Sequence, residues 1–380
     1  MLMAANAQPS PATAEHSEFL TRLDAQLHER IAAIDSAAVG AGADAAILAQ
    51  LIGVLMQGGK RMRARLAFSA WGGYLQAPAS EPAATVLALG AGLELFQAAA
   101  LLHDDIIDRS ETRRGAASAH VVLSAAHRNQ QGTGDSAHFG TAGAILAGDL
   151  ALIAADDAAA EARELAAQSP HADRIVPRLR ELWREMAIGV TAGQYLDLYS
   201  QSLPDWGENT DRDRARSLEV VLAKSARYSV EFPLVLGATL AGASPDEAAR
   251  LAGFGRPLGE AFQLRDDVLG VFGDPAVTGK PAGDDIREGK RTALLTETLV
   301  LADPRDGVRL TRLVRAGELP AKEVAWITRL MASTGALERV EAMIAMRLEA
   351  SLSALAECSL RPDAAEGLRQ LAIANVTRSA

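Results

Sequence analysis

Three aspartates and two arginines lie close together in the segment LLHDDIIDRSETRRG, residues 101–115. On an α-helix, Asp104 and Asp108 would be one turn apart and face the same way, with Asp105 offset by about 100°. Unpaired carboxylates at this spacing repel one another. Mg²⁺ relieves the repulsion, and it needs few protein ligands when phosphate oxygens supply the others. The segment indicates either an acidic helix end in solvent or one side of a magnesium–diphosphate site.

A second acidic pair occurs in FQLRDDVLG, residues 262–270. On a helix, Gln263 and Asp267 would be one turn apart, and Asp266 would lie beside the same surface. Helical bundles usually build metal sites between facing helices. Either acidic motif alone is weak evidence, but the two together predict a metal site in a cavity between helices.

Basic residues accompany both acidic motifs. The segment GGKRMRAR (58–65) is predicted to begin a helix, where Lys60, Arg61 and Arg63 would oppose the helix dipole unless an anion binds there. Arg113 and Arg114 add two fork-shaped donors that suit phosphate. The other basic residues of this set are Lys224, Lys280 and Lys290. Each cation alone would usually be a solvated surface charge, but the joint pattern predicts a Mg²⁺-dependent reaction on a diphosphate in an apolar cavity.

The elements that position these residues are predicted to be helices. Of the 380 residues, 49% are hydrophobic but only 4% are aromatic, and alanine and leucine dominate. Apolar residues recur at helical spacing, and no period-2 alternation is long enough for a sheet. A first helix is expected from Ser17 onward, with Phe19, Leu20, Leu23, Leu27 and Ile31 on one face. Further helices are expected at about 45–56, 60–76, 82–107, 141–166, 174–201, 211–229, 231–241, 245–272, 291–302, 307–316, 320–332, 334–358 and 362–375. The fold class is therefore all-α, a single-domain bundle of helices.

The domain is expected to span residues 16–380 after a disordered tail at 1–15, with loop insertions at 128–140 and 166–174. A net charge of −10 argues against nonspecific nucleic-acid binding. The single cysteine, Cys358, excludes an intrachain disulfide framework. We find neither a signal peptide nor an apolar run long enough for a membrane span, and we expect a cytoplasmic protein.

Seven ordered motifs between about Gly58 and Thr292 resemble the trans-isoprenyl diphosphate synthases, the polyprenyl synthetase family. They are GGKRMR, ELFQAAALLHDDIIDRSETRRG, AILAGDL, GQYLDL, KSARYS, FQLRDDVLGVFGD and GKPAGDDIREGKRT. The last two look most like those of actinobacterial geranylgeranyl or short-chain polyprenyl diphosphate synthases. The resemblance implies an isoprenoid-synthase bundle with a deep central cavity, usually a homodimer. The implied reaction is head-to-tail 1′-4 condensation of isopentenyl diphosphate with an allylic diphosphate (dimethylallyl, geranyl or farnesyl).

The resemblance also implies roles for individual residues. Three Mg²⁺ ions would hold the allylic diphosphate between the acidic motifs. The ions would be bound by Asp104, Asp108, Asp266 and Asp267, and Asp105 would orient ligands. The allylic diphosphate would be bound by Arg113, Lys224, Lys290 and, as a loop closes, Lys280. Isopentenyl diphosphate would be bound by Lys60, Arg63, Arg114 and Gln97. Gln263, Lys224 and Ser225 would present dipoles to the allylic cation.

Three positions depart from the family pattern. Gly270 stands where many members have a third aspartate in the second acidic motif, so Asp266 and Asp267, with Asp274 nearby, would carry the metal there. Gln97 replaces a histidine, and Ser225 replaces a threonine. In GKPAGDD, Asp284 is an extra acid, and Asp285 matches the family aspartate with an expected structural role.

Product length is expected to depend on the helix before the first acidic motif. The positions four and five residues ahead, where the family places bulky residues, are Ala100 and Ala99. Phe96 lies eight residues ahead, about 12 Å lower on a helix, and would form a deeper floor. We favour geranylgeranyl diphosphate or a somewhat longer product, although the alanines could simply be close-packing residues.

Other functions remain open at this stage. A farnesyl diphosphate synthase differs only in product length. A class I terpene cyclase needs no second diphosphate site, so GGKRMR and the Arg113–Arg114 pair argue against it. A non-catalytic subunit of a heteromeric prenyl synthase commonly loses an acidic motif, and Gly270 leaves that alternative open.

Overall fold

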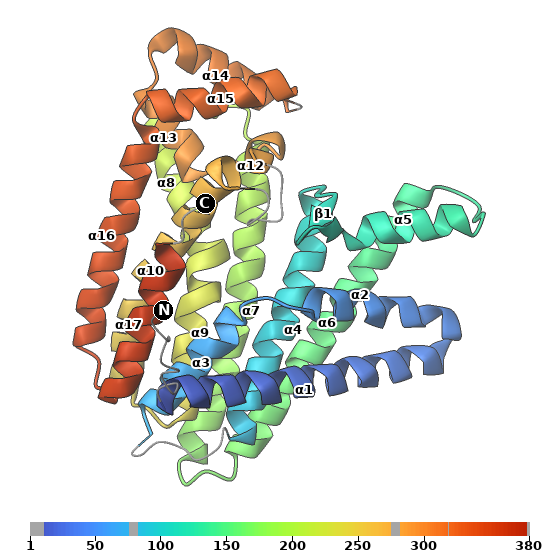
Figure 1. Cartoon of the computed structure of the whole chain (residues 1–380), viewed down its shortest axis with the longest axis vertical. Coiled ribbons are helices and arrows are strands. Elements are labelled where there is room, and N and C mark those ends of the chain that lie inside the picture. The colour runs from blue at the N-terminus through green and yellow to red at the C-terminus, as the bar shows by residue number, and fades with distance from the viewer. Residues whose placement is uncertain (1–10, 76–82, 275–281, 318, 378–380) are drawn as a thin grey trace, which may run out of the picture.

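The computed structural model describes residues 11–75, 83–274, 282–317 and 319–377, and it is an all-α bundle (Figure 1). The long helices that enclose its centre run side by side, and a helical hairpin closes one end. The helices, including the 3₁₀ turn η1 and the π-helix η2, are α1 Pro11–Ala41, η1 Ala43–Ala45, α2 Ala46–Met56, α3 Met62–Gly73, α4 Ala84–Ile107, α5 Ala119–Asn129, α6 Ser136–Ala166, α7 Ala172–Ser202, α8 Thr210–Val220, η2 Val221–Glu231, α9 Phe232–Leu240, α10 Pro245–Phe272, α12 Asp284–Arg287, α13 Ala293–Leu301, α14 Pro304–Ala316, α15 Ala321–Ser333, α16 Ala336–Ala356 and α17 Pro362–Val376.

The strands of the described chain are β1 Thr112–Arg113 and β2 Ala116–Ala117, which pair as a short antiparallel hairpin. The two turn residues, Arg114 and Gly115, both have positive φ, 53° and 77°. Two-residue hairpin turns favour this conformation because its twist matches that of the strands. The sequence pattern did not predict the hairpin, since each strand is too short for alternation to be visible.

Capping residues explain several helix boundaries. Ser244 and Glu247 form a reciprocal capping box that fixes the start of α10. The observed bounds of α10 agree with the predicted helix at 245–272. Thr292 caps the N-terminus of α13, where its side chain accepts a hydrogen bond from the backbone N–H of Leu295.

The predicted loop at 128–140 is wrong at both ends. α5 continues to Asn129, and α6 begins at Ser136, where Asp135 accepts a hydrogen bond from the backbone N–H of Ala137. This cap gives the helix start a favourable partner within a segment whose polar residues read as a loop. The expected tail also overlaps α1, which begins at Pro11; residues 1–10 lie outside the described chain. The turn at 167–171 agrees with the predicted second loop.

Small residues bring α4 and α6 close together. Every third or fourth residue on one side of α6 is a buried alanine, in a row from Ala144 through Ala155 to Ala166. On α4, a side chain at Gly92 would have its Cβ only 3.1 Å from the carbonyl oxygen of Ala155. The alanine-rich composition therefore serves the close approach of these two helices.

Two hydrophobic clusters hold the bundle together. One unites α1–α4, α6, α7 and α9, and the other unites α3, α9 and α10 with the C-terminal helices α13–α17. In Figure 1, α3, α9 and α10 stand between the two groups. Both groups pack against these central helices, and the upper ends of α4, α7 and α10 face one another across a cavity.

The π-helix η2 follows α8 without a break and carries two residues per turn toward the cavity. The cavity-lining pairs are Val220–Val221, Lys224–Ser225 and Tyr228–Ser229. The wider i→i+5 turn repeats at more than four residues, so these pairs stay in register with the cavity. The sequence predicted one helix over this range but not its π geometry.

Two helices, α4 and α6, are long and apolar enough to cross a membrane, judged by length and composition alone. Within its apolar window α4 is 78% buried inside the protein, whereas the window of α6 is only 28% buried. α4 is thus a core helix, and α6 carries an apolar face that the described chain leaves uncovered.

Candidate active site

The central cavity has a volume of about 300 Å³ and lies between α3, α4, α7, η2, α10 and the segment before α13. It brings together most of the residues predicted from the sequence. Those that line it are Arg63, Gln97, Ala100, Asp104, Arg113, Lys224, Ser225, Gln263, Asp266, Asp267 and Lys290.

Asp104 is surrounded by donors on three elements. It accepts hydrogen bonds from Lys224 Nζ and Gln194 Nε2, both at 3.2 Å, and Arg113 Nη2 lies 3.5 Å away. Burial would raise the pKa of Asp104, but Lys224, Lys290 and Arg113 together lower it to about 2. The carboxylate is therefore ionised at any physiological pH.

Asp105 has a different main contact, because it is offset from Asp104 by about 100° around α4. Its side chain is 2% exposed and accepts a hydrogen bond from Arg113 Nε at 2.8 Å, with a second contact from Nη2. Asp105 therefore orients the guanidinium of Arg113 beside the cavity, rather than a ligand directly.

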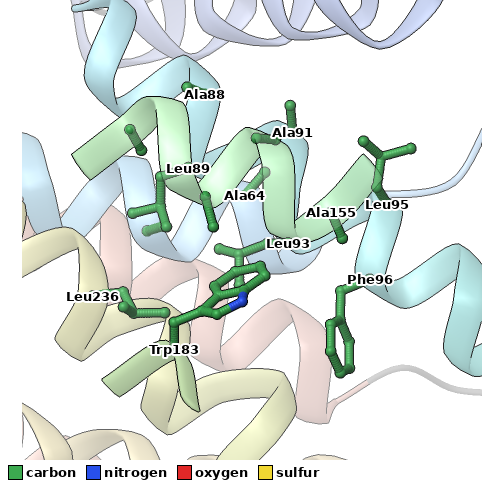
Figure 2. Close-up of a cluster of buried hydrophobic side chains, with 14 of the residues drawn as sticks. Ala64, Ala88, Leu89, Ala91, Leu93, Leu95, Phe96, Ala155, Trp183 and Leu236 are labelled. Carbon is green, nitrogen blue, oxygen red and sulfur yellow. The ribbon is translucent and has the colours of Figure 1, made fainter. Parts of the chain in front are cut away.

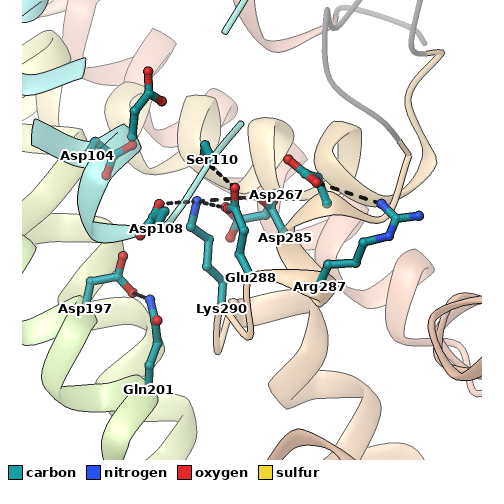
Figure 3. Close-up of polar contacts among 12 residues, drawn as sticks. Asp104, Asp108, Ser110, Asp197, Gln201, Asp267, Asp285, Arg287, Glu288 and Lys290 are labelled. Carbon is teal, nitrogen blue, oxygen red and sulfur yellow. Dashed lines mark hydrogen bonds and ion pairs between the residues drawn. The ribbon is translucent and has the colours of Figure 1, made fainter. Parts of the chain in front are cut away.

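Asp108 ends α4 and lies beside Lys290 (Figure 3). Lys290 Nζ is 2.7 Å from Asp108, 2.6 Å from Glu288 and 3.7 Å from Asp285. Burial raises the pKa of Asp108 to about 6, although Lys290 opposes the shift, and the charge of Asp104 adds to it. Three carboxylates thus share one ammonium, whose own pKa they raise well above its usual value against the effect of burial.

The second acidic motif faces the first across the cavity. Asp266 and Asp267 both line the cavity, and Asp267 is only 5% exposed and accepts a hydrogen bond from Gln263 Nε2 at 2.8 Å. Burial raises the pKa of Asp267 to about 8, with further increases from the charges of Asp285 and Asp266. A cation bound here would relieve the repulsion among these carboxylates and favour the ionised form of Asp267.

Asp285 occupies the space that a third aspartate of this motif would need. A Cβ at Gly270 would lie 2.1 Å from Asp285 Oδ2. The glycine therefore permits a carboxylate from the α12 segment to approach the second acidic motif. At Gly270, the carboxylate nearest the second acidic motif therefore comes from Asp285 on a different element.

These residues fit Mg²⁺ in a particular way. Within the described residues, no three metal-ligating side chains converge on a preformed site. The acidic motifs instead face each other, with Lys224 and Lys290 lying among their carboxylates. Mg²⁺ suits such a site because it takes most of its oxygen ligands from water and substrate phosphates.

A second basic group lies next to the first. Arg63 donates a hydrogen bond to Ser229 Oγ at 2.6 Å, and its guanidinium lies over the ring of Tyr228, 4.5 Å from the centroid. Arg114 donates to the carbonyl oxygen of Leu55 at 2.8 Å. Burial lowers the pKa of Arg114, and the nearby positive charges of Arg61, Arg113 and Arg63 lower it further. Such crowding of cations would be relieved by an anion.

The hairpin turn separates the two adjacent arginines. Arg113 reaches Asp105 on α4, whereas Arg114 reaches toward Gly59, where a Cβ would lie 3.2 Å from its Nη2. Neighbouring residues thus serve the two basic groups because the turn between the strands sends their side chains apart.

Several predicted residues lie elsewhere. The helix predicted from residue 60 begins at Met62, so Lys60 is an exposed loop residue and Arg61 is the helix cap. Arg61 is buried and bound to Asp24 at 3.0 Å, so it holds the loop in place. Of the two alanines expected to set product length, Ala100 lines the cavity, whereas Ala99 is fully buried in the core. Lys280 lies outside the described residues.

Sequence reasoning assigned no role to two residues of the GQYLDL motif. Gln194 binds Asp104, and Asp197 accepts a hydrogen bond from Lys224 at 2.7 Å. The signal was present, because two polar residues three positions apart would share one face of a long helix. Tyr228 was also missed; its hydroxyl donates to Gln97 Oε1 at 3.0 Å and so orients the amide that replaces the family histidine.

The fold and the site define an all-α protein with two facing acidic motifs and two basic groups around one cavity. Residues 45–331 match the polyprenyl synthetase family model, and the chain belongs to that family. It is 35% identical over 261 residues to a geranylfarnesyl diphosphate synthase from Aeropyrum pernix, covering 69% of this chain and 72% of the relative. It is 30% identical to an octaprenyl diphosphate synthase from Escherichia coli, covering 73% of this chain and 77% of the relative.

A solved structure is similar over nearly the whole length. It is a geranylgeranyl pyrophosphate synthase from Corynebacterium glutamicum complexed with isoprenyl diphosphate and magnesium. The TM-score is 0.85 at 38% sequence identity, covering 95% of this chain and 99% of that one. The three relatives make products of different lengths, so family membership leaves the product length of this chain open.

Proposed function

We propose that this chain is a prenyltransferase that condenses isopentenyl diphosphate head-to-tail with an allylic diphosphate to make an all-trans prenyl diphosphate. The observation that carries the proposal is the single cavity in which two acidic motifs face each other, with Lys224 and Lys290 between them. A cyclase would have no use for the second basic group of Arg63 and Arg114. Both acidic motifs are in place, which argues against a non-catalytic subunit.

The first diphosphate, that of the allylic substrate, would be bound by the residues that surround the acidic motifs. Lys224 and Lys290 now pair with carboxylates, and they would turn to the phosphate oxygens when substrate enters. Arg113 is held at the cavity wall by Asp105 and needs little reorganisation. These cations would stabilise the charge that develops on the departing diphosphate.

Mg²⁺ would be held by Asp104, Asp108 and Asp266, with Asp267 and Asp285 behind them, and when bound it neutralises charge on the leaving diphosphate. A set of three ions remains part of the proposal. The carboxylates of this chain would keep the diphosphate in one orientation, and the apolar walls would exclude water from the reacting carbon.

The second diphosphate, that of isopentenyl diphosphate, would be bound by Arg63 and Arg114, with Lys60 reaching in from its exposed loop. Gln97 would add a neutral donor, which Tyr228 orients from behind. Gln263 and Ser225, which line the same cavity, would present their dipoles to the allylic carbon as it loses its leaving group.

The favoured product is geranylgeranyl diphosphate or a somewhat longer chain. The support is the small side chain of Ala100 in the cavity wall and the position of the ring of Phe96 one turn below it. Farnesyl diphosphate remains the alternative product.

We further propose that the chain acts as a homodimer joined along α6 and α7. Large apolar side chains are exposed on both helices, and Ile153, Ile188 and Tyr195 are 66%, 62% and 63% exposed. Contiguous apolar surface of this kind usually marks an interface. A second copy of the chain supplies a matching face through a two-fold axis. A cytoplasmic location also remains part of the proposal.

The test is a product assay with the purified full-length chain. It would receive Mg²⁺, isopentenyl diphosphate and each allylic primer in turn, with products identified by mass spectrometry. We expect chain elongation with at least one primer. Products that form without isopentenyl diphosphate would indicate a cyclase, and a lack of product with every primer would contradict the proposal.

A matched pair of variants assigns the reaction to this site. Asp104→Asn should lower turnover by about 100-fold or more, because it removes a carboxylate that faces the diphosphate. Asp211→Asn makes the same chemical change at a side chain that is 93% exposed, and it should have no effect. Equal activities for the two variants would place the chemistry elsewhere.

A further inference from the structure

The walls of the central cavity continue downward into three aromatic rings. Ala100 on α4 lies one turn above Phe96, and Val190 on α7 lies two turns above Trp183. Tyr228 of η2 lines the cavity itself. The rings of Phe96 and Trp183 meet edge to face with centroids 6.0 Å apart, and Phe96 lies 5.5 Å from Tyr228. Three different helices thus contribute one aromatic cluster below the cavity, here called the floor; of the three rings, that of Tyr228 lines the cavity directly, with Phe96 and Trp183 behind it.

The indole of Trp183 is held from two sides. Its Nε1–H donates to Asp156 Oδ1 on α6 at 3.1 Å. On α4, Gly92 leaves room for the ring, because a Cβ there would lie 3.3 Å from Trp183 Cη2. Figure 2 shows the indole between Leu236 and Phe96. Trp183 is therefore placed by its neighbours, and its 6% exposure leaves it little freedom to move aside.

Open space lies on the far side of this ring. A small apolar void of about 10 Å³ is lined by Trp183 together with Leu89, Leu179, Leu236 and Leu240. A larger groove of about 640 Å³ between α6 and α7 is also lined by Trp183, but most of its other lining residues are charged, among them Arg180 and Arg184. Trp183 thus borders the floor of the central cavity, the void and the groove at once.

We propose that Trp183 sets the maximum length of the prenyl product by separating the cavity from these spaces. The inference rests on the proposed function. The growing tail is apolar, and it would extend from the diphosphate past Ala100 until it meets the Phe96–Trp183 pair. Removing the indole would free the volume of the ring and join the cavity to the leucine-lined void, so a longer tail could be buried.

The first experiment is a product assay of Trp183→Ala, with Trp183→Leu as a second variant that keeps more core volume if the alanine variant fails to fold. We expect the main product to lengthen by at least one isoprene unit relative to the wild type. Trp183→Phe, which retains a ring, should change the product length less. An unchanged product distribution in a variant that unfolds cooperatively would overturn the inference.

A merely structural role for Trp183 would lower activity without changing product length. Asp156→Leu offers a further test, because it frees the indole without removing it. We expect a broader distribution of product lengths from this variant. A narrow distribution identical to that of the wild type would show that the hydrogen bond has no part in the limit.

A binding measurement tests the floor independently of catalysis. Prenyl diphosphates of increasing length are titrated into the wild type and Trp183→Leu by calorimetry with Mg²⁺ present. We expect the variant to bind a chain one isoprene unit beyond the wild-type limit about tenfold more tightly, since more apolar surface is buried. Binding of shorter chains should be unchanged. If the wild type elongates no primer, the proposed function fails, and equal length limits for the two proteins in this titration would still decide against the floor.

Discussion

At the residue scale, the two lysines of the site form ion pairs with its carboxylates. Lys224 is paired with Asp104 and Asp197, and Lys290 is shared by Asp108, Glu288 and Asp285. Buried ions are costly unless paired, so each pair keeps the chain stable before substrate arrives. The same groups are those expected to bind phosphate and metal. Substrate binding would therefore exchange one set of partners for another.

A first prediction concerns the charge state of Asp267. Its pKa is raised to about 8 from an ordinary value of about 4, so the folded chain holds this proton more tightly than the unfolded chain. The stabilisation from this carboxyl is present below about pH 4 and is lost as the pH rises toward about 8. Without metal, Asp267→Asn should therefore be more stable than the wild type at about pH 9, on the order of 1 to 5 kcal/mol, with a smaller difference at about pH 5.

Denaturant unfolding at both pH values, with a chelator present, measures this difference. Asp211→Asn is the control, because it makes the same chemical change at a side chain that is 93% exposed. Parallel stability curves for the wild type and Asp267→Asn would contradict the raised pKa.

A second prediction concerns the close approach of Gly270 to Asp285. Gly270→Ala would push the Asp285 carboxylate away, because the new Cβ would lie 2.1 Å from Oδ2. Lys290 would then lose its ion pair with Asp285. We expect turnover to fall by about 10- to 100-fold, as small misplacements in a site do.

Gly253 on the same helix is the matched control. A Cβ at Gly253 meets nothing within 4 Å, so Gly253→Ala should leave activity unchanged and stabilise the helix by about 0.5 to 1 kcal/mol. Steady-state kinetics and thermal unfolding of both variants provide the measurement. Full activity of Gly270→Ala would show that the position of Asp285 is unimportant.

At the element scale, α4 divides its functions by face. Asp104, Ala100 and Phe96 follow one another at four-residue spacing on the side of the substrate. Ala99 and Gly92 lie toward neighbouring helices and allow them to approach. A helix with both faces buried reads as continuously apolar, so the two roles cannot be separated by composition.

A third prediction uses two adjacent alanines of this helix. Ala100→Phe should place a ring in the cavity wall and shorten the main product, as measured by mass spectrometry. Ala99→Phe should instead overpack the core and cost about 1 to 3 kcal/mol of stability, with less effect on product length. The opposite outcome, a shorter product from Ala99→Phe alone, would contradict the assignment of the two faces.

At the scale of the whole molecule, an apolar surface remains after the bundle has folded. α6 packs its alanine side against α4 but leaves Ile145, Leu146 and Ile153 at the surface. α7 does likewise with Ile188, Tyr195 and Tyr199, and the last two rings stack with centroids 6.1 Å apart. α7 therefore lines the cavity on one side and contributes to the proposed interface on the other, while α6 packs behind α4 and contributes to the interface alone.

A fourth prediction follows for assembly. Ile153→Glu should convert a dimer into a monomer, because burying an unpaired charge in an apolar interface is costly. Light scattering coupled to size-exclusion chromatography measures the change. Val308→Glu is the control, since Val308 on α14 is 72% exposed and lies away from these helices. A wild-type chain that is monomeric at all concentrations would contradict the proposed interface.

The sequence by itself determined the helical class, most helix boundaries and the chemical character of the site. Periodicity and capping residues act over a few neighbouring positions, so they can be read locally, as at Ser244 and Thr292. Asp104 and Asp266 could be proposed as metal-site residues, because acidic pairs on apolar helices are unfavourable unless a cation binds them. The types and spacing of these residues predicted the chemistry of the site before the fold was known.

Only the tertiary structure decided which residues meet. Asp285 fills the space above Gly270, Trp183 reaches Phe96 from another helix, and Ala99 turns away from the cavity. None of these contacts can be read from the sequence, because each depends on the distance between helices that are far apart in the chain. Close packing sets those distances through small residues such as Gly92. The packed helices, rather than the motifs, decide where the cavity ends.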